Sequence, residues 1–284
     1  MKSLKELYRI GIGPSSSHTI GPRIAAETYL RNHPDAQGFR VTLYGSLAAT
    51  GKGHLTDYAI LQVLGENRTE LIWCPEIVLP FHPNGMKFEV RKNNNDFQDE
   101  WIVYSVGGGA LVEDGKQQTE TPEVYDLDHL SDIQQWCQER GVSYWEYVQH
   151  CEGSEIWDYL EKVWHTMCEA VERGIEHEGV LPGVLKLRRK APDYYIRAMG
   201  YPSNLQSRAF VFAYALAVSE ENASGGTIVT APTCGASGVV PAVLYHLHKT
   251  RNFKEKRILH ALATAGLVAV SYTHLRAHET RSNL

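Results

Sequence analysis

The stretch FRVTLYGSLAATGKG at residues 39–53 decides the fold expected for the first part of the chain. Its first half alternates apolar and polar side chains, and its second half is interrupted by glycines. This pattern predicts a β-strand that ends in a glycine-rich turn. The run EIVLPFHPNGM at residues 76–86 has the same character, and a helix is expected between the two near residues 59–64.

Two more apolar runs follow, FEV at residues 88–90 and WIVYSV at residues 101–106. They predict strands joined by a polar hairpin loop at residues 92–99, and the glycines at residues 107–109 end the second strand. An acidic, turn-rich stretch then extends to about residue 128. The first part of the chain therefore looks like a mixed sheet with helices.

Beyond residue 128 the apolar pattern acquires helical periodicity. One stripe predicts a core-facing helix that stops at Gly174, and its members are Ile156, Leu160, Val163, Trp164, Met167 and Val171. A second helix, residues 209–221, is apolar on nearly all sides and is expected to be buried centrally. The sequence predicts an α+β protein, with an N-terminal α/β sandwich-like β domain at residues 1–128 and an all-α helical domain at residues 129–269.

The composition excludes several classes of protein. The chain has 284 residues, 43% of them hydrophobic and 21% charged, which is typical of a globular protein. A net charge of −5 disfavours nucleic-acid binding, although a local basic cluster could hold one anion. That cluster is Lys186, Arg188, Arg189 and Lys190. The longest apolar run, residues 209–218, is shorter than the roughly 20 residues that span a bilayer, so we expect a cytoplasmic protein without a membrane partner.

The segment GIGPSSSHTIGP at residues 11–22 concentrates glycines, prolines, serines and a histidine just before an expected helix. Such a loop offers backbone N–H groups and hydroxyls to a carboxylate, and His18 can move protons near neutral pH. A serine-rich helix cap is an equally good interpretation of these residues taken alone.

A second polar segment, GSLAATGKGHLTD at residues 45–57, lacks the residues of a phosphate-binding P-loop at Ser46 and Gly53. It presents Lys52 and His54 together with Thr56 and Asp57, which can supply a base, a hydroxyl and a carboxylate that orients the histidine. Ser105 lies at a strand end before three glycines, where the backbone can approach a ligand closely, although a plain turn explains the glycines as well.

The five cysteines, Cys74, Cys137, Cys151, Cys168 and Cys234, form no C-x-x-C pair, which argues against a disulfide framework. Cys234 lies in the segment APTCGASGVVPAVL, directly before an expected helix. A helix N-terminus there would lower the pKa of its thiol and suit a nucleophile or metal ligand, although a buried, inert cysteine is the default for one thiol.

Seven motifs, in this order and spacing, resemble the single-chain bacterial iron–sulfur-dependent L-serine dehydratases over about residues 4–267. They are GIGPSSSHTIGP, YGSLAATGKGHLTD, LPFHPNGM, YSVGGG, EGVLPGVL, EENASGG and APTCGASGVVPAVL. The resemblance implies an L-serine ammonia-lyase that converts L-serine to pyruvate and ammonia, in amino-acid degradation and gluconeogenesis. It also implies a β domain, a helical domain that holds a 4Fe-4S cluster, an active site between them and a homodimer.

Carried over position by position, the resemblance implies proton transfer by His18 and His54. It implies that Ser16, Thr56 and Ser105 hold the substrate or orient those rings, and that the remaining positions bind substrate. Those remaining positions are Ser15, Ser17, Thr19, Asn84 and Gly85. Which histidine is the base stays open at this point.

Two departures from the family pattern concern the cluster. Where many family members carry a cysteine, this chain has Ser237, so Cys234 is the candidate metal ligand in its place. Residues 270–284, VSYTHLRAHETRSNL, do not continue the pattern towards two further cysteines, and we expect them to be a non-native tail. Such a truncated chain is expected to lack most of the cluster ligands, to be unstable and to be inactive.

Two other functions fit parts of the sequence. A non-catalytic amino-acid sensor would bind serine in the first domain and use the helical part only as a dimerisation module. A pyridoxal-phosphate dehydratase would run the same reaction through a lysine Schiff base, for which Lys52 is the nearest option.

Overall fold

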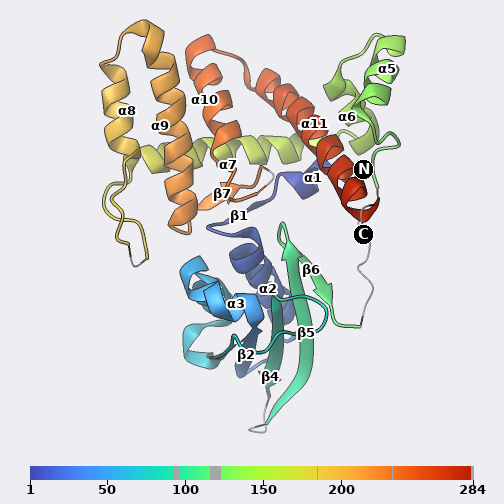
Figure 1. Cartoon of the computed structure of the whole chain (residues 1–284), viewed down its shortest axis with the longest axis vertical. Coiled ribbons are helices and arrows are strands. Elements are labelled where there is room, and N and C mark those ends of the chain that lie inside the picture. The colour runs from blue at the N-terminus through green and yellow to red at the C-terminus, as the bar shows by residue number, and fades with distance from the viewer. Residues whose placement is uncertain (93–95, 116–122, 184, 232, 283–284) are drawn as a thin grey trace.

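The computed structural model describes residues 1–92, 96–115, 123–183, 185–231 and 233–282. These residues form an α+β protein with a mixed five-stranded sheet in one part and a bundle of helices in the other (Figure 1). The fold class expected from the sequence is therefore confirmed. Within the described ranges, none of the helices is both long and apolar enough to cross a membrane.

The five-stranded sheet has the order β3-β2-β4-β5-β6. Strand β2 (Gly38–Tyr44) pairs in parallel with β3 (Thr69–Cys74) and antiparallel with β4 (Gly85–Arg91). Strand β5 (Phe97–Gly107) continues the antiparallel order and is followed by β6 (Ala110–Glu113). The expected hairpin of β4 and β5 is confirmed, although residues 93–95 of its loop lie outside the described residues.

Alternation of side chains along the strands decides which face of the sheet is buried. Every second residue of β2 and β4 is buried in one hydrophobic core with residues of three helices. The helices are α2 (Gly21–Asn32), α4 (Thr56–Leu64) and the short α3 described next, and the strand residues are Phe39, Val41, Leu43, Met86, Phe88 and Val90. The short α3 (Gly45–Thr50) follows β2 directly, so the polar segment after β2 lies at the end of the sheet.

The helical part is built around α7 (Ile156–Glu176), which lies across it in Figure 1. The apolar stripe expected from the sequence is buried throughout, because Ile156, Leu160, Val163, Trp164, Met167 and Val171 all face the second core. The other helices in this part are α5 (Leu130–Arg140), α6 (Tyr144–Glu152), α8 (Ala191–Met199), α9 (Ser203–Ala223), α10 (Val239–Arg251) and α11 (Glu255–Ser282).

Two details of the helical part differ from expectation. Helix α7 does not stop at Gly174 but continues to Glu176. The glycine is instead the position at which the backbone of α9 approaches the helix closely. Helix α9 is buried only along its second half, and the side chain of Phe212 is 55% exposed. Helix α9 is therefore apolar on nearly all sides in sequence but is buried over only part of its length.

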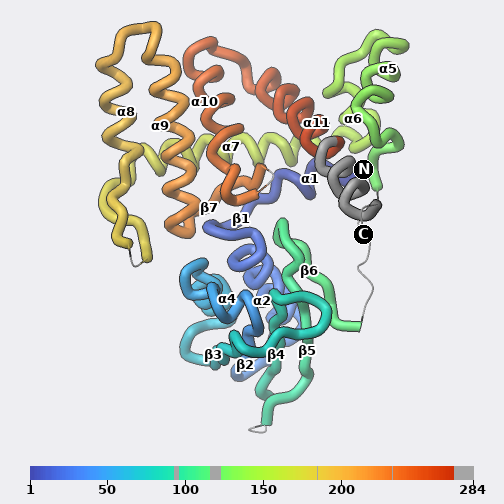
Figure 2. Tube along the Cα trace, viewed as in Figure 1, coloured from blue at the N-terminus to red at the C-terminus, as the bar shows by residue number. Residues whose placement is uncertain are grey.

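The chain begins in the helical part, enters the sheet part and returns, as the trace in Figure 2 shows. Leu4 and Leu7 of α1 (Leu4–Leu7), and Tyr8 after it, are buried in the helical core. Strand β1 (Ile10–Ile12) then pairs antiparallel with β7 (Thr227–Val229) in a separate two-stranded sheet. This pairing places the next loop, residues 13–20, between the two parts of the molecule.

Close packing of α7 on α9 makes Gly174 sensitive to substitution. A Cβ atom at Gly174 would lie 2.3 Å from the carbonyl oxygen of Ala217, which is backbone and cannot move aside cheaply. We expect Gly174→Ala to lower the free energy of unfolding by about 1–3 kcal/mol, measured by chemical denaturation. The control is Gly235→Ala, where the nearest atom is 3.9 Å away, and equal stability of the two variants would contradict this packing.

Candidate active site

The serine-histidine loop forms a π-helical turn, Ser16–Ile20, directly before α2. The Ser15 hydroxyl oxygen accepts a hydrogen bond from the backbone N–H of His18 at 3.1 Å, so Ser15 does act as a cap. Its own backbone N–H donates to the Thr19 hydroxyl at 3.2 Å. The cap and the site are therefore the same loop, because capping fixes the backbone that carries His18.

His18 and His54 lie side by side, with ring centroids 4.8 Å apart and ring planes at 40°. Their segments are joined by two reciprocal hydrogen bonds. The Thr19 hydroxyl donates to the carbonyl oxygen of His54 at 2.6 Å, and the Thr56 hydroxyl donates to that of His18. The structure thus brings together two motifs that are far apart in the sequence.

Each imidazole is oriented by its own neighbours. His18 Nδ1 lies 2.9 Å from the hydroxyl oxygen of Ser17, and His18 Nε2 lies 3.2 Å from that of Ser46. His54 Nδ1 lies 3.0 Å from the carbonyl oxygen of Thr50. Because a hydroxyl can both donate and accept, the serines can follow a change in the protonation of His18. Sequence reasoning missed Ser46 and Thr50, which only the turn after β2 brings to the histidines.

The expectation that Asp57 orients His54 is not supported by the contacts. The Asp57 carboxylate accepts a hydrogen bond from the backbone N–H of Tyr58 at 2.9 Å. Lys52, the other charged residue of this segment, lies with its ammonium 5.5 Å from the centre of the Trp73 ring. The backbone carbonyl of Thr50, four residues before His54, takes the orienting role instead.

The pKa of His18 lies below its ordinary value. Burial has the largest effect because it disfavours the charged ring, and the charge of the neighbouring His54 acts in the same direction. A hydrogen bond to Ser46 opposes both. The His18 ring is therefore held in its neutral form near neutral pH, in which it can accept a proton.

Ser105 belongs to β5 and packs against Gly21 at the start of α2. Its side chain is fully buried, and its hydroxyl oxygen has no hydrogen-bond partner within the described ranges. A Cβ atom at Gly21 would lie only 2.1 Å from that oxygen, so glycine is needed there. Asn84 holds the strand end in place, because its side-chain amide donates to the Ser105 carbonyl at 3.1 Å.

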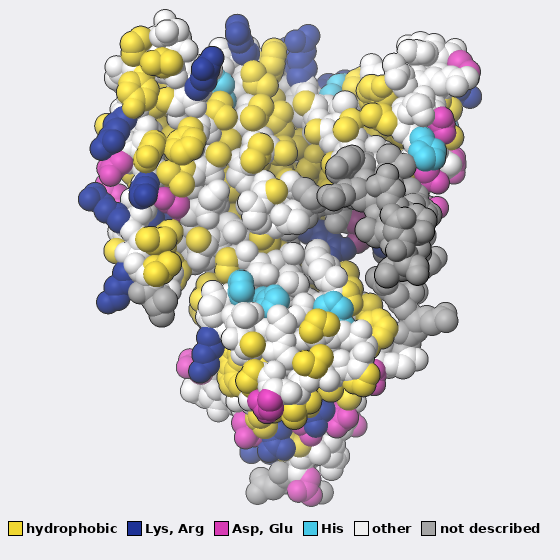
Figure 3. Space-filling model, in the orientation of Figure 1, with side chains coloured by type: hydrophobic (Ala, Val, Ile, Leu, Met, Phe, Trp, Pro, Cys, Tyr) yellow, Lys and Arg dark blue, Asp and Glu magenta, His cyan; other side chains and the backbone are white. Residues whose placement is uncertain are grey.

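Gly85 begins β4 and pairs with Tyr104, the residue before Ser105. The β5–β6 turn is connected to the helical part through Arg9, whose guanidinium donates to the carbonyl oxygen of Gly108. The backbone of Arg9 in turn exchanges hydrogen bonds with Thr230 after β7. Histidine side chains gather on the sheet part close to its boundary with the helical part (Figure 3).

Cys234 is buried in the helical core, which agrees with the default interpretation of a buried cysteine and not with a thiol of lowered pKa. Burial raises the pKa of its thiol to about 11, because α10 begins only at Val239 and does not offset the loss of water around the sulfur. The hydroxyl of Ser237 in the same turn is also buried and has no hydrogen-bond partner in the part of the chain that the structure describes.

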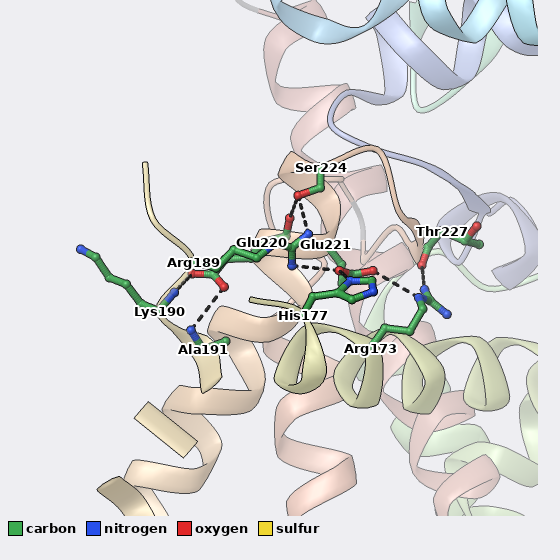
Figure 4. Close-up of polar contacts among 9 residues, drawn as sticks. All are labelled: Arg173, His177, Arg189, Lys190, Ala191, Glu220, Glu221, Ser224 and Thr227. Atoms are coloured by element: carbon green, nitrogen blue, oxygen red, sulfur yellow. Dashed lines mark hydrogen bonds and ion pairs between the residues drawn. The ribbon is translucent and has the colours of Figure 1, made fainter. Parts of the chain in front are cut away.

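A buried network of charges next to the site was not found from the sequence. Glu221, 2% exposed, accepts hydrogen bonds from Arg173 at 3.2 Å, from His177 at 2.8 Å and from Arg189 at 3.0 Å (Figure 4). Its neighbour Glu220 accepts from the backbone at the start of α8. One signal in the sequence could have indicated this network. Glu220 and Glu221 come at the end of an apolar helix, and carboxylates that are buried there need charged or hydrogen-bonding partners.

The network also shows what one residue of the basic cluster at residues 186–190 binds. Arg189, which the sequence suggested could hold an external anion, holds the carboxylate of Glu221 instead. Burial alone would raise the pKa of Glu221, but the hydrogen bonds from His177, Arg189 and Arg173 outweigh it, so its pKa lies below the usual range.

Glu221 is followed directly by the turn that contacts the serine-histidine loop. The side-chain amide of Asn222 donates to the carbonyl oxygen of Pro14 at 3.4 Å, and the Gly13 N–H donates to that of Gly226 at 3.1 Å. A Cβ atom at Gly13 would lie 2.1 Å from the backbone oxygen of Asn222. The charged network therefore fixes the surface against which the loop packs.

Comparison with known proteins gives matches over nearly the whole chain. A family model described as serine dehydratase beta chain matches residues 3–72, and one described as serine dehydratase alpha chain matches residues 65–277. The L-serine dehydratase TdcG of Escherichia coli is 33% identical, with 96% of this chain and 72% of the relative covered. An L-serine dehydratase of Mycobacterium tuberculosis is 36% identical, with 87% and 65% covered. The chain belongs to the serine dehydratase family.

The charge on Glu221 should stabilise the fold above the usual titration range of glutamate and lose that effect as the pH falls and it becomes protonated. We expect Glu221→Gln to cost about 3 kcal/mol near neutral pH, because it leaves the buried guanidinium of Arg189 without a charged partner. The difference from the parent chain should shrink in acid.

The measurement is chemical denaturation across a pH series. Glu178→Gln, on an exposed residue just past α7, is the control and should change stability little at any pH. A difference between the parent chain and Glu221→Gln that does not change with pH would contradict a charged Glu221.

Proposed function

We propose that the chain is an L-serine ammonia-lyase, which removes water from L-serine and releases pyruvate and ammonia. The observation that supports this most strongly is the pair formed by His18 and His54, locked together by two reciprocal hydrogen bonds at the boundary of the two parts. The relatives named L-serine dehydratase cover most of the chain and support the same activity.

In this proposal the neutral His18 ring removes the α-proton of serine. The lowered pKa of His18 suits it to act as the base, because a base must be unprotonated at the working pH. His54 then donates a proton to the departing hydroxide. The product aminoacrylate takes up water and breaks down to pyruvate and ammonia.

The remaining residues bind or orient the substrate. Ser15, Ser16 and Ser17 would receive the substrate carboxylate at the turn before α2, where backbone N–H groups and the helix N-terminus favour an anion. Thr19 acts by positioning instead, because its hydroxyl proton is donated to the carbonyl oxygen of His54. Thr56 holds the His18 segment in place. Ser105 offers its unpartnered hydroxyl to the substrate, and Asn84 and Gly85 fix the strand end from which it projects.

The resemblance also implies a 4Fe-4S cluster, which would supply a Lewis acid for the substrate hydroxyl. Cys234 is the candidate ligand, since it lies in the glycine-rich turn before α10. The other cysteines lie in β3, α5, α6 and α7, and no three of the five converge in the described part of the chain. These residues do not fit a cluster, so the proposed steps use only the side chains of the chain itself.

We further propose a cytoplasmic homodimer. All five cysteines are free, which suits a reducing compartment. Apolar side chains gather over α8, α9 and α10 (Figure 3), including Ile196, Met199 and Phe212, each more than half exposed. Exposed apolar patches of this kind are typical of surfaces that a second protein copy covers.

The activity is tested by incubating the chain with L-serine without oxygen, both as purified and after treatment with iron and sulfide. Although the missing cluster ligands predicted an inactive chain, the intact histidine pair leads us to expect pyruvate and ammonia in equal amounts. His18→Asn should lower turnover by at least about 100-fold, the usual contribution of a general base, without changing the melting temperature. His150→Asn, on an exposed histidine of α6, should leave turnover unchanged.

The alternative is an amino-acid sensor, which binds serine without converting it. Serine binding in calorimetry with no pyruvate in either preparation would support the sensor and overturn the enzyme. For the third function considered, Lys52 would have to form a Schiff base, and its ammonium instead lies near the Trp73 ring.

The assignment of His18 as the base predicts how its titration depends on His54. Burial keeps the pKa of His18 below its ordinary value in any variant that preserves the fold. In His54→Gln the neighbouring positive charge is gone, so we expect the midpoint to move upwards, as followed by NMR titration of the His18 ring. An unchanged midpoint would show that the two rings do not interact.

A further inference from the structure

Three potential metal ligands meet on the outside of the helical part. Glu161 and His165 lie four residues apart on α7, so their side chains project from the same face of that helix. Glu255 is the first residue of α11. One ligand atom from each lies within 4.8 Å of the others, and no other such trio of His, Cys, Asp or Glu occurs in the ranges that the structure describes.

The contact between His165 and Glu255 has the character of two ligands of one ion. His165 Nε2 and Glu255 Oε1 are 2.8 Å apart. Nevertheless, Glu255 Oε1 is shielded from solvent and has no hydrogen-bond partner among the described residues. Two atoms bound at about 2.0–2.2 Å and at right angles around one ion lie about 3 Å apart, close to this separation, whereas a tetrahedral ion would move them to about 3.4 Å.

Further carboxylates lie near the trio. Cys168 lies almost one turn beyond His165, and burial is the main reason why the pKa of its thiol is raised to about 12. The carboxylates of Glu172, Glu255 and Glu169 act in the same direction, which places them close to this part of α7, together with the ammonium of Lys249, which opposes them.

We propose that Glu161, His165 and Glu255 form a binding site for a divalent transition-metal ion such as Zn²⁺. One imidazole nitrogen with two carboxylate oxygens suits this class of ion, whereas a set of oxygens alone would favour Mg²⁺ or Ca²⁺. Glu161 and His165 are exposed, so water completes the coordination. None of these ligands belongs to the proposed active site, and none is a cysteine.

The bound ion would act on the fold. Helices α7 and α11 share the core, and α11 begins at Glu255 after the turn that follows α10. An ion held by both helices joins the start of α11 to the middle of α7. It also neutralises two carboxylates that otherwise face each other, and by binding only the folded state it stabilises that state.

The test uses the full chain after removal of metals with a chelator. Co²⁺ is titrated as a spectroscopic probe of ligand geometry, and Zn²⁺ is titrated in a calorimeter. We expect one ion per chain, visible ligand-field bands from Co²⁺, and a higher melting temperature with Zn²⁺. His165→Ala and Glu161→Gln should each weaken Zn²⁺ binding by at least about 10-fold, a loss already caused by changing residues that merely orient a ligand.

A matched control is available on α6, where Glu146 and His150 have the same spacing of four residues. His150→Ala should therefore bind Zn²⁺ as the parent chain does. Equal Zn²⁺ affinity in His165→Ala and the parent chain, or failure of the parent chain to bind Co²⁺ and Zn²⁺, would overturn the proposal. Because the metal-free melting temperatures of all variants are measured as well, loss of binding is distinguished from loss of fold.

Discussion

The pairing of β1 with β7 is the interaction on which the rest of the structure depends. Ile10, Gly11 and Ile12 pair with Val229, Ile228 and Thr227, so a strand near the start of the chain is completed by one more than two hundred residues later. The serine-histidine loop follows β1 without a spacer. The position of His18 is therefore set by a contact with the helical part, although its partner His54 belongs to the sheet part.

The loop is held from both sides by polar interactions of different strength. On the sheet side, the hydroxyls of Thr19 and Thr56 donate to the backbone of the opposite segment. On the helical side, Asn222 contacts Pro14, and its neighbour Glu221 is fixed by two arginines and a histidine. Buried charges of this kind are costly unless every partner is present. Here the partners are present, so Glu221 and the turn that follows it are held in one arrangement.

The sequence predicted the secondary structure correctly where buried apolar residues recur at the spacing of a strand or a helix. The alternating residues of β2 and β4 and the stripe on α7 are buried as expected, because a side chain's direction along a strand or helix is fixed by backbone geometry. Predictions failed where a neighbouring element decided the outcome. Gly174 looked like a helix stop and is instead the place where α9 approaches α7. Of the two interpretations of Cys234, the structure agrees with the buried thiol, whose pKa burial raises, and not with a thiol activated by a helix N-terminus.

By itself, the sequence determined the α+β class, the main elements and the motifs that carry His18, His54 and Ser105. It could do so because each of these depends on residues close together in the chain. Only the tertiary structure decided which groups meet: Ser46 beside His18, Thr50 beside His54, Arg189 on Glu221, and Glu255 beside His165. Such contacts join residues from different elements, and their distances depend on how whole helices and strands pack, which no local pattern encodes.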